Sequence, residues 1–141
     1  MCFRSYKPND KNNCYHIYWF CTLEQSLNWV FNFPRLSSFP KGIFSAMKNL
    51  QILDLNKNKF VEIQGLSFHG LDNLKILRLR RNQIEYLMDG AFFGLSRIEE
   101  LSLDRNKVPT VNKGWLYGLT TLRYLSLSFN RVSSSILKKF I

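Results

Sequence analysis

Residues 50–58 have the sequence LQILDLNKN, with leucines at the first, fourth and sixth positions and an asparagine at the ninth. The same spacing returns every 24 residues, at 74–82 (LKILRLRRN), 98–106 (IEELSLDRN) and 122–130 (LRYLSLSFN), where Ile98 replaces one leucine. A fixed period of roughly 20 to 50 residues indicates a chain built by stacking copies of one small structural unit. The nine residues therefore predict a repeat array.

The second half of each period is repeated as well. A Gly-Leu pair closes the units at 70–71, 94–95 and 118–119. Three apolar columns precede it: Phe60, Ile84, Val108 and Val132; Ile63, Leu87 and Val111; Phe68, Phe92, Leu116 and Phe140. The pattern L-x-x-L-x-L-x-x-N with this period is that of leucine-rich repeats.

The pattern predicts an α/β-type solenoid, a curved leucine-rich-repeat array truncated at both ends. Each L-x-L segment forms a short strand that points alternate side chains inward, and neighbouring repeats pair their strands in parallel on the concave face. The asparagine side chain can satisfy backbone groups of the turn that follows the strand. The asparagines of this structural ladder are Asn58, Asn82, Asn106 and Asn130.

The repeat block is expected over 36–141, with a partial first unit, repeats starting near 50, 74, 98 and 122, and the last one incomplete. One period before Leu50, the strand columns hold Ser26, Trp29 and Phe31, and Pro34 replaces the asparagine. Residues 1–35 are therefore predicted to be an atypical, poorly packed non-repeat head. A degenerate first repeat and a wrongly placed gene or splice boundary both explain it, and we favour the second. Because the chain stops inside a repeat, we expect a piece of a longer protein.

The net charge and the positions of the cysteines limit the ligands that the chain is expected to bind. The formal net charge of +10 favours acidic partners such as nucleic acid, glycosaminoglycan or an acidic protein face. Cys2, Cys14 and Cys21 all lie in the head without metal-ligand spacing, so neither a metal site nor a cofactor is expected, and their disulfide state is open. No apolar run reaches the roughly 20 residues of a membrane span, and no clear signal peptide is present.

Binding by a repeat array is expected on the concave face. The candidate ligand-binding residues are Lys57, Arg81, Arg105, Phe129, Ile52, Ile76, Tyr124, Arg78 and Arg80. Lateral neighbours predict two ion pairs, Asp54 with Arg78 and Arg80 with Asp104. Lys57, Arg81 and Arg105 stack like charges instead. They form either a solvated basic stripe, which we favour slightly, or an anion-binding stripe.

The convex turns carry the aromatic residues Phe93, Trp115 and Tyr117, for which packing is favoured over a second contact surface. The repeat block has no cysteine and one histidine, His69. It also lacks a nucleophile–histidine–acid spacing and a Gly-rich phosphate loop. The sequence therefore predicts a protein that is not an enzyme and has no small-molecule substrate.

Three convex segments are more specific: GLSFHGL at 65–71, LMDGAFFGL at 87–95 and NKGWLYGL at 112–119. They resemble the family called leucine-rich repeats and immunoglobulin-like domains, over residues 36–132. The resemblance implies a fragment of a cell-surface ectodomain that binds a receptor ectodomain and modulates growth-factor receptor signalling. The leading hypothesis is thus a non-catalytic protein-binding scaffold at the cell surface or outside the cell. The alternative is a basic repeat protein that binds a polyanion, either glycosaminoglycan or RNA.

Overall fold

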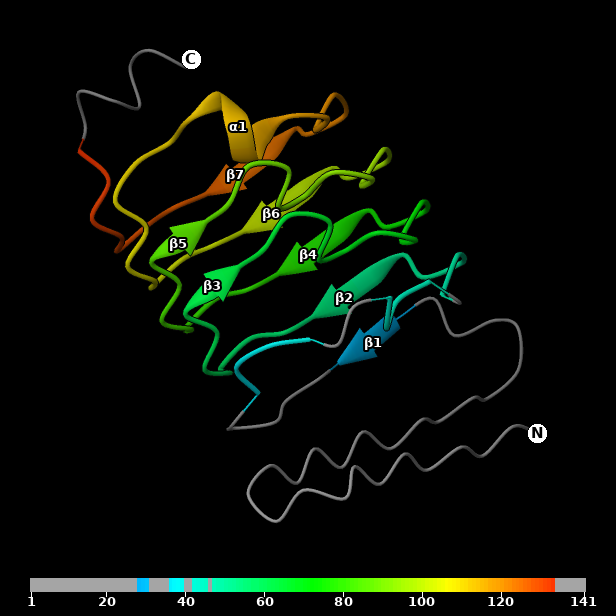
Figure 1. The fold of residues 1–141 in the computed structure, drawn as a ribbon, viewed down its shortest axis with the longest axis horizontal. Helices are drawn as coiled ribbons and strands as arrows, with labels where there is room; N and C mark the ends of the chain where they lie inside the picture. Colours follow the sequence, from blue (N-terminus) through cyan, green and yellow to red (C-terminus); the bar gives the residue numbers. More distant parts are fainter. Residues whose placement is uncertain (1–27, 31–35, 40–41, 46, 134–141) are drawn as a thin grey trace.

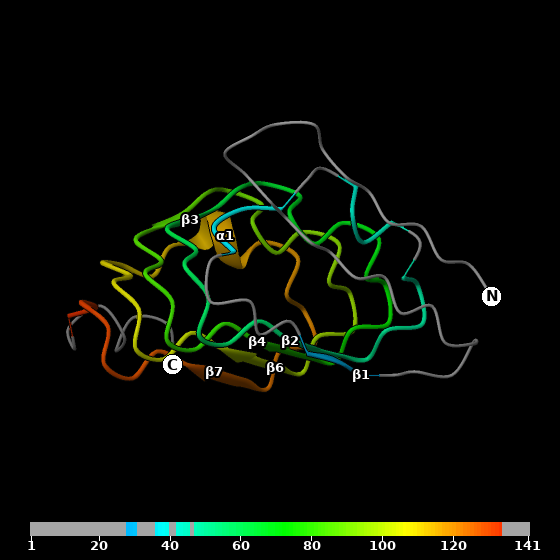
Figure 2. The same ribbon diagram turned by 90° about the horizontal axis from the view of Figure 1, so that it is seen from below.

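The computed structural model describes residues 28–30, 36–39, 42–45 and 47–133. The expectations for Cys2, Cys14 and Cys21, for most of the head and for Phe140 lie outside these residues. Within the described part the chain winds as a curved solenoid, with a sheet along one side and turns along the other (Figures 1 and 2).

The concave side is one parallel sheet of five three-residue strands. In spatial order these are β1 (Asn28–Val30), β2 (Ile52–Asp54), β4 (Ile76–Arg78), β6 (Glu100–Ser102) and β7 (Tyr124–Ser126). Neighbouring strands pair with an offset of 24 residues, for example Leu53 with Leu77 and Leu101 with Leu125. This register confirms the solenoid, because the offset between paired strands equals the 24-residue period of the sequence.

Strand β1 differs from the sequence expectation. Residues 1–35 were predicted to supply no repeat strand, yet Asn28–Val30 pairs with β2 in the same 24-residue register, Trp29 opposite Leu53. The expectation is wrong for these three residues. Parallel pairing uses backbone groups that every non-proline residue carries, so the edge of β2 can accept a strand that lacks the leucine pattern. A domain boundary near residue 35 otherwise stays a prediction.

The convex side contains three further elements that the sequence did not indicate. The strands β3 (Glu62–Ile63) and β5 (Tyr86–Leu87) form a second, two-stranded parallel sheet. The next convex segment instead forms the short helix α1 (Lys113–Leu116). Asn112 caps this helix, because its Oδ1 accepts a hydrogen bond from the Trp115 N–H at 3.2 Å. Asparagine at this position satisfies one of the unpaired N–H groups of the first turn.

The core lies between the two sides. The leucine columns are fully buried in the central repeats, as Leu53, Leu77 and Leu101 show with 0% exposure. In the last repeat Leu125 and Leu127 are only half-buried. Each repeat therefore depends on its neighbour to cover its apolar columns, which is the source of stability in stacked repeats.

An aromatic row fills the convex half of the core. The rings of Phe68 and Phe92 stack with centroids 5.8 Å apart, and the Trp115 ring meets Phe92 edge-on at 5.9 Å. The 24-residue register placed Leu116 in this column, but Leu116 is half-buried and Trp115 is 1% exposed. The column assignment is wrong by one residue, because this segment folds as helix α1 and the helix buries Trp115 rather than Leu116.

The ladder asparagines connect consecutive repeats. The Asn82 amide donates to the carbonyls of Leu79 at 2.9 Å and Leu55 at 3.0 Å. Its Oδ1 accepts from the Phe60 N–H at 3.3 Å. Asn106 and Asn130 repeat the same three bonds one and two units further along. These amides therefore satisfy backbone groups that the three-residue strands leave unpaired.

Candidate ligand-binding face

The concave face presents its first outward column at the start of each strand. In register, this column holds Ile52, Ile76, Glu100 and Tyr124. The first three are half-buried, and Tyr124 is 57% exposed. The structure thus brings the expected apolar residues Ile52 and Ile76 side by side, whereas Glu100 separates them from Tyr124.

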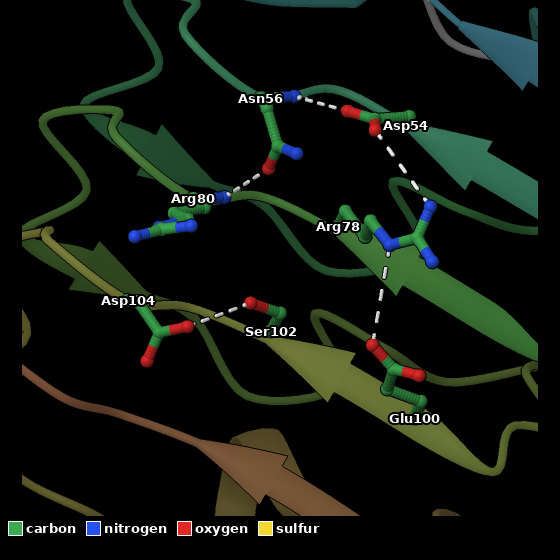
Figure 3. A network of polar contacts seen from close by, with 7 residues as sticks. All are labelled: Asp54, Asn56, Arg78, Arg80, Glu100, Ser102 and Asp104. Carbon is green, nitrogen blue, oxygen red and sulfur yellow. Dashed lines mark hydrogen bonds and ion pairs between the residues drawn. The ribbon is translucent and has the colours of Figure 1, made fainter.

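In the middle of the sheet, Arg78 lies between two carboxylates, as Figure 3 shows. Its Nη1 is 3.9 Å from Asp54 Oδ2, the expected partner, and its Nε is 4.0 Å from Glu100 Oε1, a partner that sequence reasoning missed. Half-exposed pairs of this kind contribute at most about 1 kcal/mol each. These two pairs hold the Arg78 side chain between carboxylates of the two neighbouring strands.

The second expected ion pair, between Arg80 and Asp104, is absent from the described structure. Asp104 instead accepts hydrogen bonds from the hydroxyls of Ser102 and Ser126 and from the backbone N–H of Ser128. The expectation was wrong because these donors are adjacent in the ladder and satisfy the carboxylate locally. The Arg80 side chain is exposed and forms no ion pair within the described residues.

At the end of each strand, one column has a left-handed backbone. Its members, with their φ angles, are Lys57 at 58°, Arg81 at 57°, Arg105 at 54° and Phe129 at 58°. The N–H of each cationic member donates to a carbonyl of the following repeat, as Arg81 does to Asp104 at 2.9 Å. The turn directs these exposed side chains to the edge of the sheet, and the asparagine after each one points inward.

The three cations of this column have no carboxylate partner among the described residues. Arg105 has a different neighbour, because its guanidinium lies 4.5 Å from the centroid of the Phe129 ring. That ring is 73% exposed. The column therefore ends in an accessible aromatic ring with a cation on one of its sides.

A second cationic column runs along the same edge and was missed by sequence reasoning. It follows the ladder asparagines and contains Lys59, Lys107 and Arg131, with the neutral Gln83 at its remaining position. Lys59 is exposed between the buried Asn58 and Phe60, so it points out of the solenoid. Arg131 pairs with Glu85 at 3.4 Å, whereas Lys59 and Lys107 form no ion pair in the described part of the chain. We call the column Lys57, Arg81, Arg105 and Phe129, together with Lys59, Lys107 and Arg131, the strand-end band.

The opposite edge of the sheet, where the strands begin, has a different character. An open pocket of about 420 Å³ there is lined by Lys75, Arg97, Glu99 and Arg123, among others. Arg97 donates to Asn73 Oδ1 at 2.7 Å, and the Glu99 carboxylate shares the pocket with the cations. This edge offers mixed charge, whereas the strand-end band is mostly cationic.

The convex aromatic residues separate into two groups. Trp115 belongs to the core, whereas Phe93 and Tyr117 are 42% and 67% exposed. Their rings stack with centroids 5.9 Å apart and planes at 6°. His69 is exposed on the same side of the solenoid. Within the described ranges, no three His, Cys, Asp or Glu side chains gather into a metal-binding group, and no helix is long and apolar enough to cross a membrane.

The fold and the sequence both resemble known proteins. The structure is similar to the crystal structure of a TLR13–ssRNA13 complex, with a TM-score of 0.67 and 28% sequence identity. The match covers 70% of this chain and 14% of that chain, so this chain spans a small part of that protein. No curated protein matches the sequence. The leucine rich repeat family profile matches residues 30–84 and 72–132, and the chain therefore belongs to the leucine-rich repeat family.

Proposed function

We propose that this chain is a non-catalytic recognition scaffold that binds an acidic macromolecule along the strand-end band. Leucine-rich repeat arrays typically serve as extended binding surfaces. The observation that carries the proposal is the column Lys57, Arg81 and Arg105, three exposed cations in register without a carboxylate partner among the described residues.

The arrangement is electrostatically unfavourable without a ligand. Parallel strands lie about 4.8 Å apart, so each repeat places a cation close to the next one. Two like charges at that distance repel by at most about 1 kcal/mol in water, and salt reduces the cost further. An anionic partner would replace this repulsion with attraction, and a net charge of +10 would steer such a partner toward the chain.

The acidic partner that we favour is a polyanion. The similar TLR13 structure is a complex with ssRNA13, which supports an RNA-type ligand for a scaffold of this shape. Arg78 does not belong to the band, because it is held between Asp54 and Glu100.

A protein ligand is the second candidate, supported by the adjacent apolar side chains of Ile52 and Ile76 and by the exposed ring of Tyr124. Aromatic side chains are common anchors in protein interfaces. A cell-surface location and an effect on growth-factor receptor signalling belong to this candidate. They rest on the sequence resemblance of the convex segments.

Charge reversal distinguishes the two edges of the sheet. The test variant changes Lys57, Arg81 and Arg105 to Glu, and the control makes the same charge change at Lys75, Arg97 and Arg123. Both are applied to a heparin column after circular dichroism has verified folding. We expect the test variant to elute at much lower salt than the parent and the control to elute between them, because binding to a polyanion depends on the number of cations it contacts. Elution of the test variant with the parent would refute the proposal and identify the band as a solvated surface.

Salt dependence separates the two candidates. Affinity for a polyanion should fall steeply as the salt concentration rises. Binding of a protein through Ile76 and Tyr124 should change little with salt and should be lost in Tyr124→Ala.

A further inference from the structure

Phe129 interrupts the charge pattern of the strand-end band. The preceding repeats place Lys57, Arg81 and Arg105 at this position, and the last described repeat places a phenylalanine there. All four residues share the same left-handed turn, so the ring occupies the place of a fourth cation. The Arg105 guanidinium lies over this ring, 4.5 Å from its centroid, and the ring is 73% exposed.

From this juxtaposition we propose that the strand-end band binds single-stranded nucleic acid, with phosphates on the cationic column and a base stacked on Phe129. The inference rests on the proposed function, since it names the acidic ligand. Grooves that combine cations along the backbone path with aromatic side chains for the bases are typical of proteins that bind single strands without sequence preference. Arg105 lies over one face of the Phe129 ring, so a base would stack on the other face.

Other polyanions use the band less completely. A sulfated polysaccharide supplies negative charge but no flat aromatic face for Phe129. A duplex supplies phosphates, but its bases are paired and stacked inside the helix. A single strand offers both groups, and its unstacked bases are available to aromatic side chains.

The dimensions of the column agree with a short stretch of nucleic acid. Four repeats at the inter-strand spacing of about 4.8 Å separate Lys57 from Phe129 by roughly 14 Å. Five nucleotides, which make four steps at a stacked rise of about 3.4 Å, span a similar length. Lys59 and Lys107 lie beside the column and extend the cationic surface to its outer side.

The neighbouring carboxylate does not contradict this assignment. Asp104 lies one residue before Arg105, but two serine hydroxyls and the Ser128 N–H already donate to it. Glu85 is likewise engaged by Arg131 at 3.4 Å. Both carboxylates thus have hydrogen-bond or ion-pair partners within the protein.

Fluorescence anisotropy on the full chain tests the inference with three labelled probes: a twelve-residue oligouridylate, an abasic oligonucleotide of the same length, and a heparin oligosaccharide. Phe129→Leu removes the aromatic face and keeps an apolar side chain. We expect it to weaken oligouridylate binding by about 5- to 100-fold, the usual effect of losing one stacked base, and to leave both other probes unchanged. Phe129→Tyr should restore binding. Tyr117→Leu is the matched control, because Tyr117 is an exposed aromatic residue of the convex side.

The outcomes separate the inference from the proposed function. If the parent binds all three probes equally and Phe129→Leu changes none of them, polyanion binding stands and base stacking is refuted. If Phe129→Leu weakens all three probes alike, the ring supports the fold of the band rather than a base, and the inference is also refuted. If the parent binds none of the probes at low salt, both proposals fail together.

Discussion

Replacing Asn82 with alanine should show how much the asparagine ladder contributes to stability. The Asn82 side chain is 8% exposed and forms three hydrogen bonds with backbone groups of two repeats. The carbonyls of Leu55 and Leu79 would each keep one other ladder amide, from Asn58 and Asn106. The Phe60 N–H would lose the one hydrogen-bond partner described for it.

The expected loss of stability follows from the number of hydrogen bonds lost and from the one donor left without a partner. A buried donor left without a partner costs about 1–3 kcal/mol, and each shared hydrogen bond that is lost costs about 0.5–1.5 kcal/mol. Together, one orphaned donor and two lost shared bonds should lower the free energy of unfolding of Asn82→Ala by about 2–6 kcal/mol. Asn130→Ala should cost less, because Asn130 is half-buried and water can replace part of its hydrogen bonding.

The assay is equilibrium unfolding in urea followed by far-ultraviolet circular dichroism. Asn73→Ala is the matched control, since Asn73 also donates to a backbone carbonyl, that of Lys48 at 2.8 Å, but in an exposed setting. We expect it to change stability by less than about 0.5 kcal/mol. A loss below about 0.5 kcal/mol for Asn82→Ala, equal to that of the control, would refute the view that the ladder holds the turns together.

Three further pairs of substitutions test single positions of the core and of the turns. Trp115→Ala should destabilise the protein by about 3–5 kcal/mol and Leu116→Ala by clearly less, because Trp115 fills the aromatic row. The reverse order in thermal melts would show that Leu116, as the 24-residue spacing predicts, belongs to the core column. Gly70→Ala should lower stability more than Gly94→Ala, although both glycines have positive φ. A Cβ at Gly70 would lie 2.8 Å from a backbone carbon, whereas the nearest atom to a Cβ at Gly94 is 3.7 Å away. Equal losses in urea melts would contradict this packing. Arg81→Val should destabilise by about 1–2 kcal/mol relative to Arg81→Asn, because asparagine tolerates a left-handed backbone and β-branched residues do not, and equal melting temperatures of the two variants would show that the turn relaxes.

The sequence predicted most of the solenoid because the period of its leucines is also the register of its sheet. Leu53, Leu77 and Leu101 occupy equivalent positions, and stacking them requires the parallel pairing that the structure shows. The same logic failed at Trp29, because a strand can join a sheet edge through its backbone without matching the apolar pattern. It failed again at Leu116, because residues 113–116 fold as a short helix whose buried residue is Trp115.

The candidate site depended less on the pattern. The columns of the concave face could be assigned from the period, and the Asp54–Arg78 pair followed from lateral neighbours. The hydrogen-bond partners of Asp104 could not be predicted from the period, because side-chain geometry decides between the Arg80 guanidinium and the nearby serine donors. Lys59 and Lys107 could have been found in the sequence, since the position after each ladder asparagine is mostly cationic.

The sequence by itself determined the fold class and the identity of the side chains in each column, because both are consequences of a fixed 24-residue spacing. The tertiary structure alone decided which of those side chains are available to a partner. Arg78 pairs with Asp54 as expected but also with Glu100, which the sequence did not indicate, whereas Arg81 itself has a left-handed backbone, is exposed and has no carboxylate partner in the described structure. Availability depends on distances between neighbouring repeats and on backbone conformation at single residues, and a one-dimensional pattern of residue types contains neither.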